Sequence, residues 1–178
     1  MRYFKKIVGD RLYLSPMNAE DAQLYTQWLN DVSVSGNIGV YAQMISLASE
    51  EKMLERMACE GQNYAMVLLD GDRLIGNISL MKIDAVHRSA TVGIFIGDAE
   101  HRGKGNGAEA LRLLLGYGFQ TLNLHNIMLH VHADNAQAIA CYKKVGFREF
   151  GRRREALFKK GAYVDVVHMD ILATEFRA

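Results

Sequence analysis

The sequence predicts a single α/β domain whose mixed central sheet of about seven strands carries helices on both faces. The chain has 178 residues, 49% of them hydrophobic, which is enough for one domain with a proper core. Short apolar segments with strand-like alternation are interleaved with longer segments of helical periodicity. One strand–helix–strand succession in the second half predicts two parallel strands joined by a right-handed crossover. We therefore expect residues 1–178 to form one domain.

The first third of the chain predicts one strand followed by two helices. Residues 11–14, Arg-Leu-Tyr-Leu, alternate as a strand does, and Pro16 closes that strand. Asn18 is a favourable N-cap for a helix with apolar residues every three or four positions. Residues 31–41 show no regular pattern, and Ser49 with the two acids after it is expected to open the second helix.

Three further strands are expected to form an antiparallel meander. Residues 64–69 are apolar, and a tight Asp-Gly-Asp turn at residues 70–72 follows them. Strands over residues 74–83 and 89–96 follow, and residues 84–88 form the loop between them. The remaining expected elements are a helix from the glycine-rich segment to about Gln120, a strand at 127–132, a helix capped by Asp134 or Asn135 and stopped by Gly146, and strands at 147–150 and 163–172.

Composition excludes several classes of function. The formal charge of +1 and the pI of about 7.8 give no basic surface for nucleic acid or for an anionic membrane. No apolar run approaches the roughly 20 residues of a membrane span, and residues 1–10 lack the apolar core of a signal peptide. Cys59 and Cys141 lack metal-ligand spacing, so we expect no metal and a reducing, cytoplasmic location.

A glycine-rich segment between a predicted strand and a predicted helix indicates a pyrophosphate site. Glycines let the backbone come close to a ligand, and the free N–H groups at a helix start, with the helix dipole, favour an anion. Two of the side chains add positive charge. The segment consists of Arg102, Gly103, Lys104, Gly105, Asn106 and Gly107.

Other phosphate-binding motifs fit this segment less well. A P-loop needs serine or threonine after the lysine, but Lys104 is followed by Gly105. A dinucleotide fingerprint can be placed on Gly103, Gly105 and Ala108, but it expects its first glycine directly after the strand, and residues 98–102 intervene. A glycine turn without a ligand is the minority interpretation.

A second motif follows the second parallel strand. Asn135, Ala138 and Tyr142 are three and four positions apart, so they share one face of the predicted helix. The tyrosine could donate a proton, and the asparagine could hydrogen-bond an amide-bearing ligand. Taken alone, a core aromatic and a simple helix cap would explain both residues better.

The two motifs together resemble the GNAT superfamily of acetyl-CoA-dependent N-acetyltransferases. The resemblance covers Arg102-x-x-Gly105-x-Gly107 and the segment from Asn135 through Tyr142 to Phe147, and nearly the whole chain follows in order. Residues 11–14 and the Gly-x-Tyr-x-Asp of residues 161–165 resemble the branch of ribosomal-protein N-terminal acetyltransferases and bacterial spermidine acetyltransferases.

The resemblance implies a sheet that opens between its two central parallel strands to admit acetyl-CoA, which leaves as coenzyme A. An amine would attack the thioester directly in a ternary complex. Backbone contacts with the pantetheine arm would come from Ile94, Phe95 and Ile96, Asn135 would hydrogen-bond the same arm, and Arg102–Gly107 would bind the diphosphate. Tyr142 would protonate the leaving thiolate.

Relatives often place a glutamate on the strand before the opening, where this chain has Thr91, so the general base stays open. Waters could remove the amine proton. His130 and His132 have a suitable pKa range, although a structural role is preferred for both. Weaker candidates are His168, Glu155 and His87.

The acceptor is expected to be a small-molecule amine or a protein N-terminus. Tyr25, Trp28 and Tyr41 could line its pocket, but core packing is the preferred explanation for the first two. Clustered carboxylates for a polyamine could come from Asp31, Glu50 and Glu51. Acidic residues are also favoured near a helix start without any ligand. A homodimer is plausible. Two alternatives stay open: a non-catalytic acyl-CoA-binding module, suggested by Thr91, and an enzyme that uses another acyl-CoA.

Overall fold

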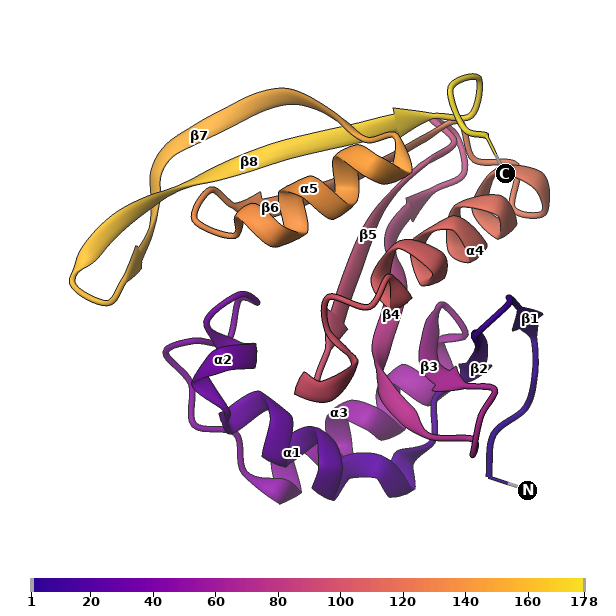
Figure 1. Cartoon of the computed structure of the whole chain (residues 1–178), viewed down its shortest axis with the longest axis vertical. Coiled ribbons are helices and arrows are strands. Elements are labelled where there is room, and N and C mark those ends of the chain that lie inside the picture. Colours follow the sequence, from indigo (N-terminus) through magenta and orange to yellow (C-terminus); the bar gives the residue numbers. More distant parts are fainter. Residues whose placement is uncertain (1, 178) are drawn as a thin grey trace. The chain divides into compact units, whose positions relative to one another are not determined.

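The computed structural model describes residues 2–177, which form eight strands, five α-helices and two 3-10 turns (Figure 1). The strands are β1 (Ile7–Val8), β2 (Leu12–Pro16), β3 (Asn63–Leu68), β4 (Leu74–Asp84), β5 (Ser89–Ile96), β6 (Asn126–His132), β7 (Arg148–Lys159) and β8 (Ala162–Leu172). The helices are α1 (Ala22–Asn30), α2 (Val32–Ser35), α3 (Leu47–Glu60), α4 (Asn106–Gln120) and α5 (Ala136–Val145). The 3-10 turns are η1 (Ala19–Asp21) and η2 (Ala99–His101).

The strands make one mixed sheet in the order β1-β2-β3-β4-β5-β6-β8-β7. The predicted parallel pair is present, since β5 and β6 run parallel with α4 between them in the chain. The sheet and its helices confirm the predicted α/β class and the fold that the resemblance implied.

Contacts within the chain define two compact units, which are described separately. Unit 1 contains residues 2–79 and 94–113, and unit 2 contains residues 80–93 and 114–177. The chain passes from one unit to the other within β4, β5 and α4. The expectation of one functional domain over residues 1–178 stays a prediction.

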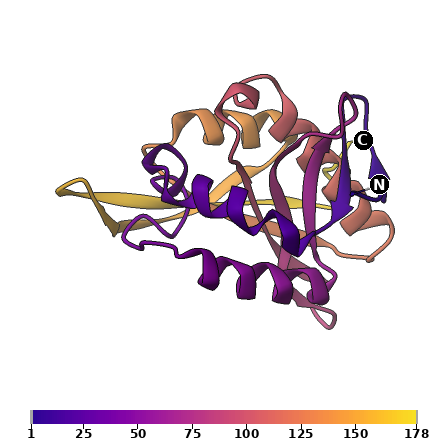
Figure 2. The ribbon, with the colours of Figure 1, turned by 90° about the horizontal axis from the view of Figure 1, so that it is seen from below.

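Unit 1 is built on the antiparallel strands β1, β2 and β3, with α1 and α3 packed side by side (Figure 2). Its core forms because the apolar positions of α1 and α3 are spaced at helical intervals and therefore face one way. Tyr13, Tyr25, Trp28 and Leu54 are buried in this core. The unit also contains η2 and the start of α4, which carry the glycine-rich segment.

Unit 2 is built on β6, β7 and β8. Strand β8 pairs antiparallel with both β6 and β7, and β7 and β8 form a long hairpin (Figure 1). Helix α5 ends at Gly146, whose φ of +116° is a left-handed conformation that glycine adopts without penalty. An added Cβ at Gly146 would lie 3.1 Å from Ile171 of β8, so the helix end lies close to the sheet.

The parallel ladder in unit 2 is short. It pairs Ser89 with Asn126, Ala90 with Ile127 and Thr91 with Met128. Strand β6 then continues to His132, paired with β8 on its other edge. The parallel pairs within unit 2 end at Met128, and the opening of the sheet beyond it stays a prediction.

Several predicted elements differ from the structure by more than a single end residue. Residues 32–35 form α2, which the irregular segment 31–41 concealed because four residues are too few for a periodic signal. Helix α3 begins at Leu47 and not at Ser49, because the Ser46 hydroxyl caps it by accepting from the Ser49 N–H. Strand β1 has only two residues and was missed.

The largest difference is β7, which runs to Lys159 although the sequence predicted a strand only at residues 147–150. Most of its residues are exposed, so burial imposes no alternation of polar and apolar side chains. Its register also shifts between Arg153 and Leu157, where Glu155 has a positive φ of 48°. A long exposed strand with a bulge has no sequence signal to distinguish it from a loop.

Other local predictions are confirmed. Asn18 caps the first helical turn by accepting from the Glu20 N–H, Asn135 caps α5, and α4 ends at Gln120. In residues 2–177, no helix combines the length and apolar character needed to cross a bilayer.

Candidate functional site

The glycine-rich segment in unit 1 is a turn that leads from η2 into α4. Gly103 and Gly105 have φ values of 71° and 86°, which side chains larger than glycine strongly disfavour. The first N–H groups of α4 have no helical carbonyl to bond. Lys104 and both glycines are exposed, so the turn offers main-chain donors and a cation to the solvent.

Asn106, the first residue of α4, is bonded through its side chain to the segment before the turn. Its Nδ2 donates to the carbonyl oxygen of His101 at 3.1 Å, and its side chain is buried. The asparagine therefore ties the turn together and is held by the protein itself. A ligand contact at this position would come from the Asn106 main chain.

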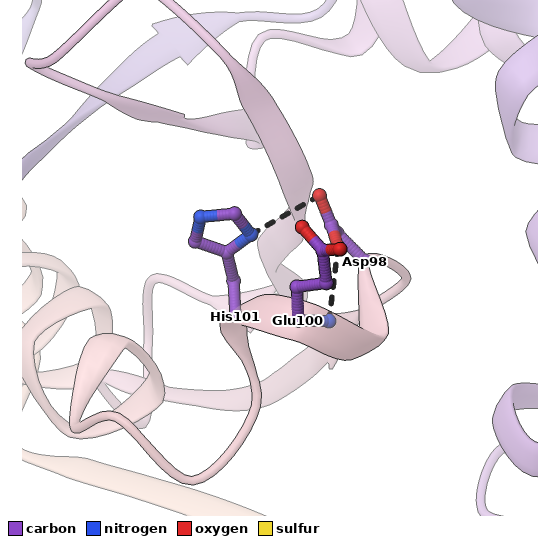
Figure 3. Close-up of side chains that lie close together, drawn as sticks. All are labelled: Asp98, Glu100 and His101. Atoms are coloured by element: carbon purple, nitrogen blue, oxygen red, sulfur yellow. Dashed lines mark hydrogen bonds and ion pairs between the residues drawn. The ribbon is translucent and has the colours of Figure 1, made fainter.

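A cluster of ionisable side chains supports η2 directly before the turn (Figure 3). Asp98 caps η2 by accepting from the Glu100 N–H, and its Oδ2 lies 3.1 Å from Nδ1 of His101. The Arg73 guanidinium lies 2.7 Å from Asp98 and 3.5 Å from Glu100. Although Asp98, Glu100 and His101 could offer three metal ligands, capping and the Arg73 ion pairs account for their arrangement.

The Arg102 side chain binds protein oxygens. Its Nε donates to the Ile96 carbonyl at 2.9 Å, Nη2 donates to the Gly97 carbonyl at 2.8 Å, and Nη1 donates to the Ser33 hydroxyl at 3.1 Å. A guanidinium has five N–H donors, so two remain for a further partner. Arg102 thus fixes the end of β5 while keeping positive charge beside the turn.

The end of β5 in unit 1 contains Ile94, Phe95 and Ile96, all half-buried. The Phe95 ring packs edge-on against Tyr25 and Trp28, with ring centroids 5.9 and 6.4 Å apart. The preferred core role of Tyr25 and Trp28 is confirmed by their burial. The backbone of this strand end is therefore held by aromatic packing on its side chains.

The second motif lies in unit 2, on α5. Asn135 Oδ1 accepts from the Ala138 N–H at 3.1 Å, which leaves the two amide N–H donors of its side chain for another partner. Tyr142 is half-buried and packs edge-on against Phe147, with centroids 6.0 Å apart. Burial, followed by the nearby Cys141, raises the pKa of Tyr142 to about 12. The phenol therefore keeps its proton at neutral pH and can act as a donor but not as a base.

The candidate bases are also in unit 2. Thr91 is buried and forms the last recorded pair of the parallel ladder, opposite Met128. His130 pairs with His168 across β6 and β8, with ring centroids 6.3 Å apart, and partial burial and then His168 lower the pKa of His130. His132 is buried. The main-chain N–H of Glu155, within β7, donates to Asp165, and that of His87, in the turn after β4, donates to Asp84.

The candidate acceptor carboxylates of unit 1 differ in environment. Asp31 caps α2, and hydrogen bonds from Ser33 hold its pKa below its ordinary value. Glu51 is exposed, whereas Glu50 is buried, and burial raises its pKa. Tyr41 is half-buried. Among these residues, only Glu50 is a buried acid. A place in the first turn of a helix explains an acidic residue, but it does not explain its burial.

Sequence reasoning missed one part of this region. Arg11 was interpreted as the start of a strand and as part of a branch motif, but its side chain also reaches the turn and donates to the Lys104 carbonyl. The 93-residue separation between these positions gives no local pattern. An arginine at a strand start facing a glycine turn becomes visible only in three dimensions.

Comparison with known proteins identifies the class. Residues 11–148 match the model of the Acetyltransferase (GNAT) domain, so the chain belongs to the GNAT acetyltransferase family. A spermidine N(1)-acetyltransferase of Vibrio cholerae is 42% identical over 103 residues, which cover 58% of this chain and 59% of that relative. An uncharacterized N-acetyltransferase, p20, of Bacillus licheniformis is 29% identical over 171 residues, covering 94% and 96% of the two chains.

A solved structure supports the same assignment. The structure of the spermidine N-acetyltransferase from Vibrio cholerae in complex with CoA and spermine is 31% identical in sequence, with a TM-score of 0.80. The match covers 92% of this chain and 96% of that protein. The predicted family is confirmed, and relatives of both kinds expected for its branch are found. The chain is an acetyl-CoA-dependent N-acetyltransferase that acts on an amine.

Proposed function

We propose that this protein acetylates a primary amine of a small cationic acceptor, by direct attack on acetyl-CoA in a ternary complex. The observation that carries the proposal is the turn at residues 102–107, whose left-handed glycines and helix start suit a diphosphate. No covalent enzyme intermediate is required, because an amine is itself the nucleophile. The whole chain, residues 1–178, would act as one domain.

The proposed donor-binding residues come from both motifs. Main-chain N–H groups of the turn would bind the diphosphate, the half-buried end of β5 would contact the pantetheine arm, and the Asn135 amide would donate to it. An added Cβ at Gly105 would lie too close to the Arg11 guanidinium, so this position of the turn favours glycine. The set is Ile94, Phe95, Ile96, Arg102, Gly103, Lys104, Gly105, Asn106, Gly107 and Asn135.

Tyr142 is the proposed general acid. The amine nitrogen attacks the thioester carbonyl carbon, the carbon–sulfur bond breaks, and the departing sulfur takes the proton from the Tyr142 hydroxyl. The attacking nitrogen loses a proton to water, and the phenol regains one from solvent. The raised pKa of Tyr142 supports this role, because the donor is fully protonated when the substrates bind.

The acceptor amine must arrive at the thioester in its neutral form. Free primary amines have pKa values near that of lysine, about 10.4, so only about one molecule in a thousand is neutral near pH 7.4. Thr91 cannot remove a proton at this pH. We propose that water carries the proton away, and that the site selects the neutral fraction.

We propose a diamine or polyamine as the acceptor. The relatives named as spermidine acetyltransferases support this class, and the buried Glu50 of unit 1 is a carboxylate that a second ammonium group could approach. A protein N-terminus is the second candidate, because a relative named for ribosomal N-acetylation also matches.

We further propose a cytoplasmic location and self-association into a homodimer or a larger assembly. The exposed aromatic residues Phe150, Phe158 and Tyr163 on the β7–β8 hairpin are available for contacts between subunits. A related spermidine N-acetyltransferase from Vibrio cholerae has a dodecameric structure. Light scattering after size exclusion would determine the assembly of this chain.

The direct test is thiol release from acetyl-CoA in the presence of an acceptor panel of diamines, polyamines, amino sugars and N-terminal peptides. We expect release to depend on an acceptor and to be largest with a diamine or polyamine. Coenzyme A binding without turnover across the panel would favour a non-catalytic acyl-CoA-binding module. Faster turnover with longer acyl chains would favour another acyl donor.

A further inference from the structure

Arg11, directly before β2, connects the start of that strand to the glycine turn. Its Nη1 donates to the Lys104 carbonyl oxygen at 2.7 Å, and its Nε donates to Oε2 of Glu109 at 2.7 Å. All three residues belong to unit 1. One guanidinium therefore holds both the turn and the first part of α4.

The bond to Lys104 sets the direction of the next N–H group. In a trans peptide, the C=O and N–H of one unit point in opposite directions. Because Arg11 holds the Lys104 carbonyl on its own side, the Gly105 N–H points away from Arg11. The guanidinium thus fixes one donor of the turn without occupying the side to which that donor points.

Glu109 fixes Arg11 in turn. Its Oε1 accepts from the main-chain N–H groups of Arg11 and Leu12 at 2.8 and 3.3 Å, in addition to the Arg11 Nε bond to Oε2. Burial raises the pKa of Glu109, but these hydrogen bonds and the Arg11 charge outweigh it and lower the pKa. The carboxylate therefore stays charged and anchors the arginine.

Two glycines make room for this arrangement. An added Cβ at Gly9 would lie 2.5 Å from Glu109 Oε1, and one at Gly105 would lie 3.0 Å from Arg11 Nη2. The pair also neutralises charge, because an unpaired carboxylate in the first turn of α4 would repel an anion at the helix start.

We propose that Arg11, anchored by Glu109, is a positioning residue for the diphosphate of the acetyl donor. It orients the Lys104–Gly105 peptide so that the Gly105 N–H faces the donor, and it shields the donor from the Glu109 charge. The proposal rests on the proposed function, because it assigns the diphosphate to the turn. Arg11 acts through the turn and makes no contact with the reacting atoms.

The test compares donors with and without the diphosphate in Arg11→Gln. The KM for acetyl-CoA should rise on the order of tenfold, as loss of an orienting partner typically does, with kcat changed by less than about threefold. Acetyl-pantetheine, which lacks the diphosphate, should keep its kcat/KM. The affinity for 3′-phospho-ADP, measured by calorimetry, should fall by the same factor as for acetyl-CoA.

Arg11→Lys should restore part of the affinity, because an ammonium can reach one of the two oxygens but cannot bridge both. Arg56→Gln, which removes the exposed Arg56–Glu60 pair of α3 in the same unit, is the matched control. It should leave kcat/KM unchanged with both donors. An equal loss with both donors, or no loss with either, would overturn the positioning role. Failure of the proposed function would instead show as wild-type protein that binds neither coenzyme A nor 3′-phospho-ADP.

Discussion

Helices α4 and α5 differ in how the free main-chain N–H groups of their first turns find acceptors. In α5 the Asn135 side chain accepts from the Ala138 N–H, so the helix caps itself. In α4 the Asn106 side chain turns back to the His101 carbonyl, and two left-handed glycines precede the helix. A self-capped helix start needs no ligand, whereas one supported from behind presents its donors outward. This difference supports the proposal that the start of α4 binds the anionic part of acetyl-CoA, while α5 carries the side chain proposed for the chemistry.

The largest effect is expected from the chemistry carried by α5. Tyr142→Phe should lower kcat by about 100-fold to 10,000-fold, the usual contribution of a general acid, while the KM for acetyl-CoA changes little. Steady-state kinetics with both substrates varied would measure this. A variant with unchanged kcat would remove Tyr142 from the acid role, and a rise in donor KM alone would make it a binding residue.

The next effect separates backbone strain from ligand binding at the α4 start. Gly105→Ala should weaken acetyl-CoA binding by about tenfold or more, because a side chain at φ of +86° is strained and its Cβ would displace Arg11. Gly161→Ala is the matched control, with φ of +81° and no atom within 4 Å of the added Cβ. Both variants should lose about 1 kcal/mol of stability. Equal donor affinity in the two variants would show that the turn does not bind the donor.

A third effect concerns stability at alkaline pH. Burial, with other causes, raises the pKa of Tyr13 in unit 1 and of Tyr142 in unit 2 to about 12, against about 10 in the unfolded chain. A raised folded pKa stabilises the protein below pH 10, and this stability is lost as pH rises from 10 to 12. Each tyrosine should contribute up to about 2 kcal/mol to this loss. Denaturant unfolding at pH 9 and pH 12 would show a smaller loss in Tyr142→Phe, and an identical loss would contradict the assignment.

The smallest effect compares the two asparagines. Asn135→Ala should lower the free energy of unfolding by about 1 kcal/mol through the lost cap. Asn106→Ala should lower donor affinity as well as stability, because the turn loses its bond to His101. Calorimetry with 3′-phospho-ADP would distinguish them, and a loss of affinity for this ligand in Asn135→Ala would break the comparison between the helix starts.

The sequence predicted elements whose signals are local. Asn18 and Gly146 marked helix ends because caps act within a few residues, and the glycine turn was visible as consecutive letters. It could not predict the length of β7, whose exposed residues carry no alternation, or the two-residue β1. In the candidate site, the turn, Asn135 and Tyr142 were found from spacing and resemblance. Arg11 and Arg73 were not, because their partners lie far away in the chain.

The central claim is that the main-chain N–H groups around Gly105 bind the diphosphate of the acetyl donor. Amide chemical shifts recorded while 3′-phospho-ADP is added to the protein test this most directly. We expect the largest changes at Gly103, Gly105, Asn106 and Gly107, with the start of α5 at Ala136 and Gln137 little affected. Largest changes at α5, or none in residues 103–107 at saturating ligand, would contradict the claim.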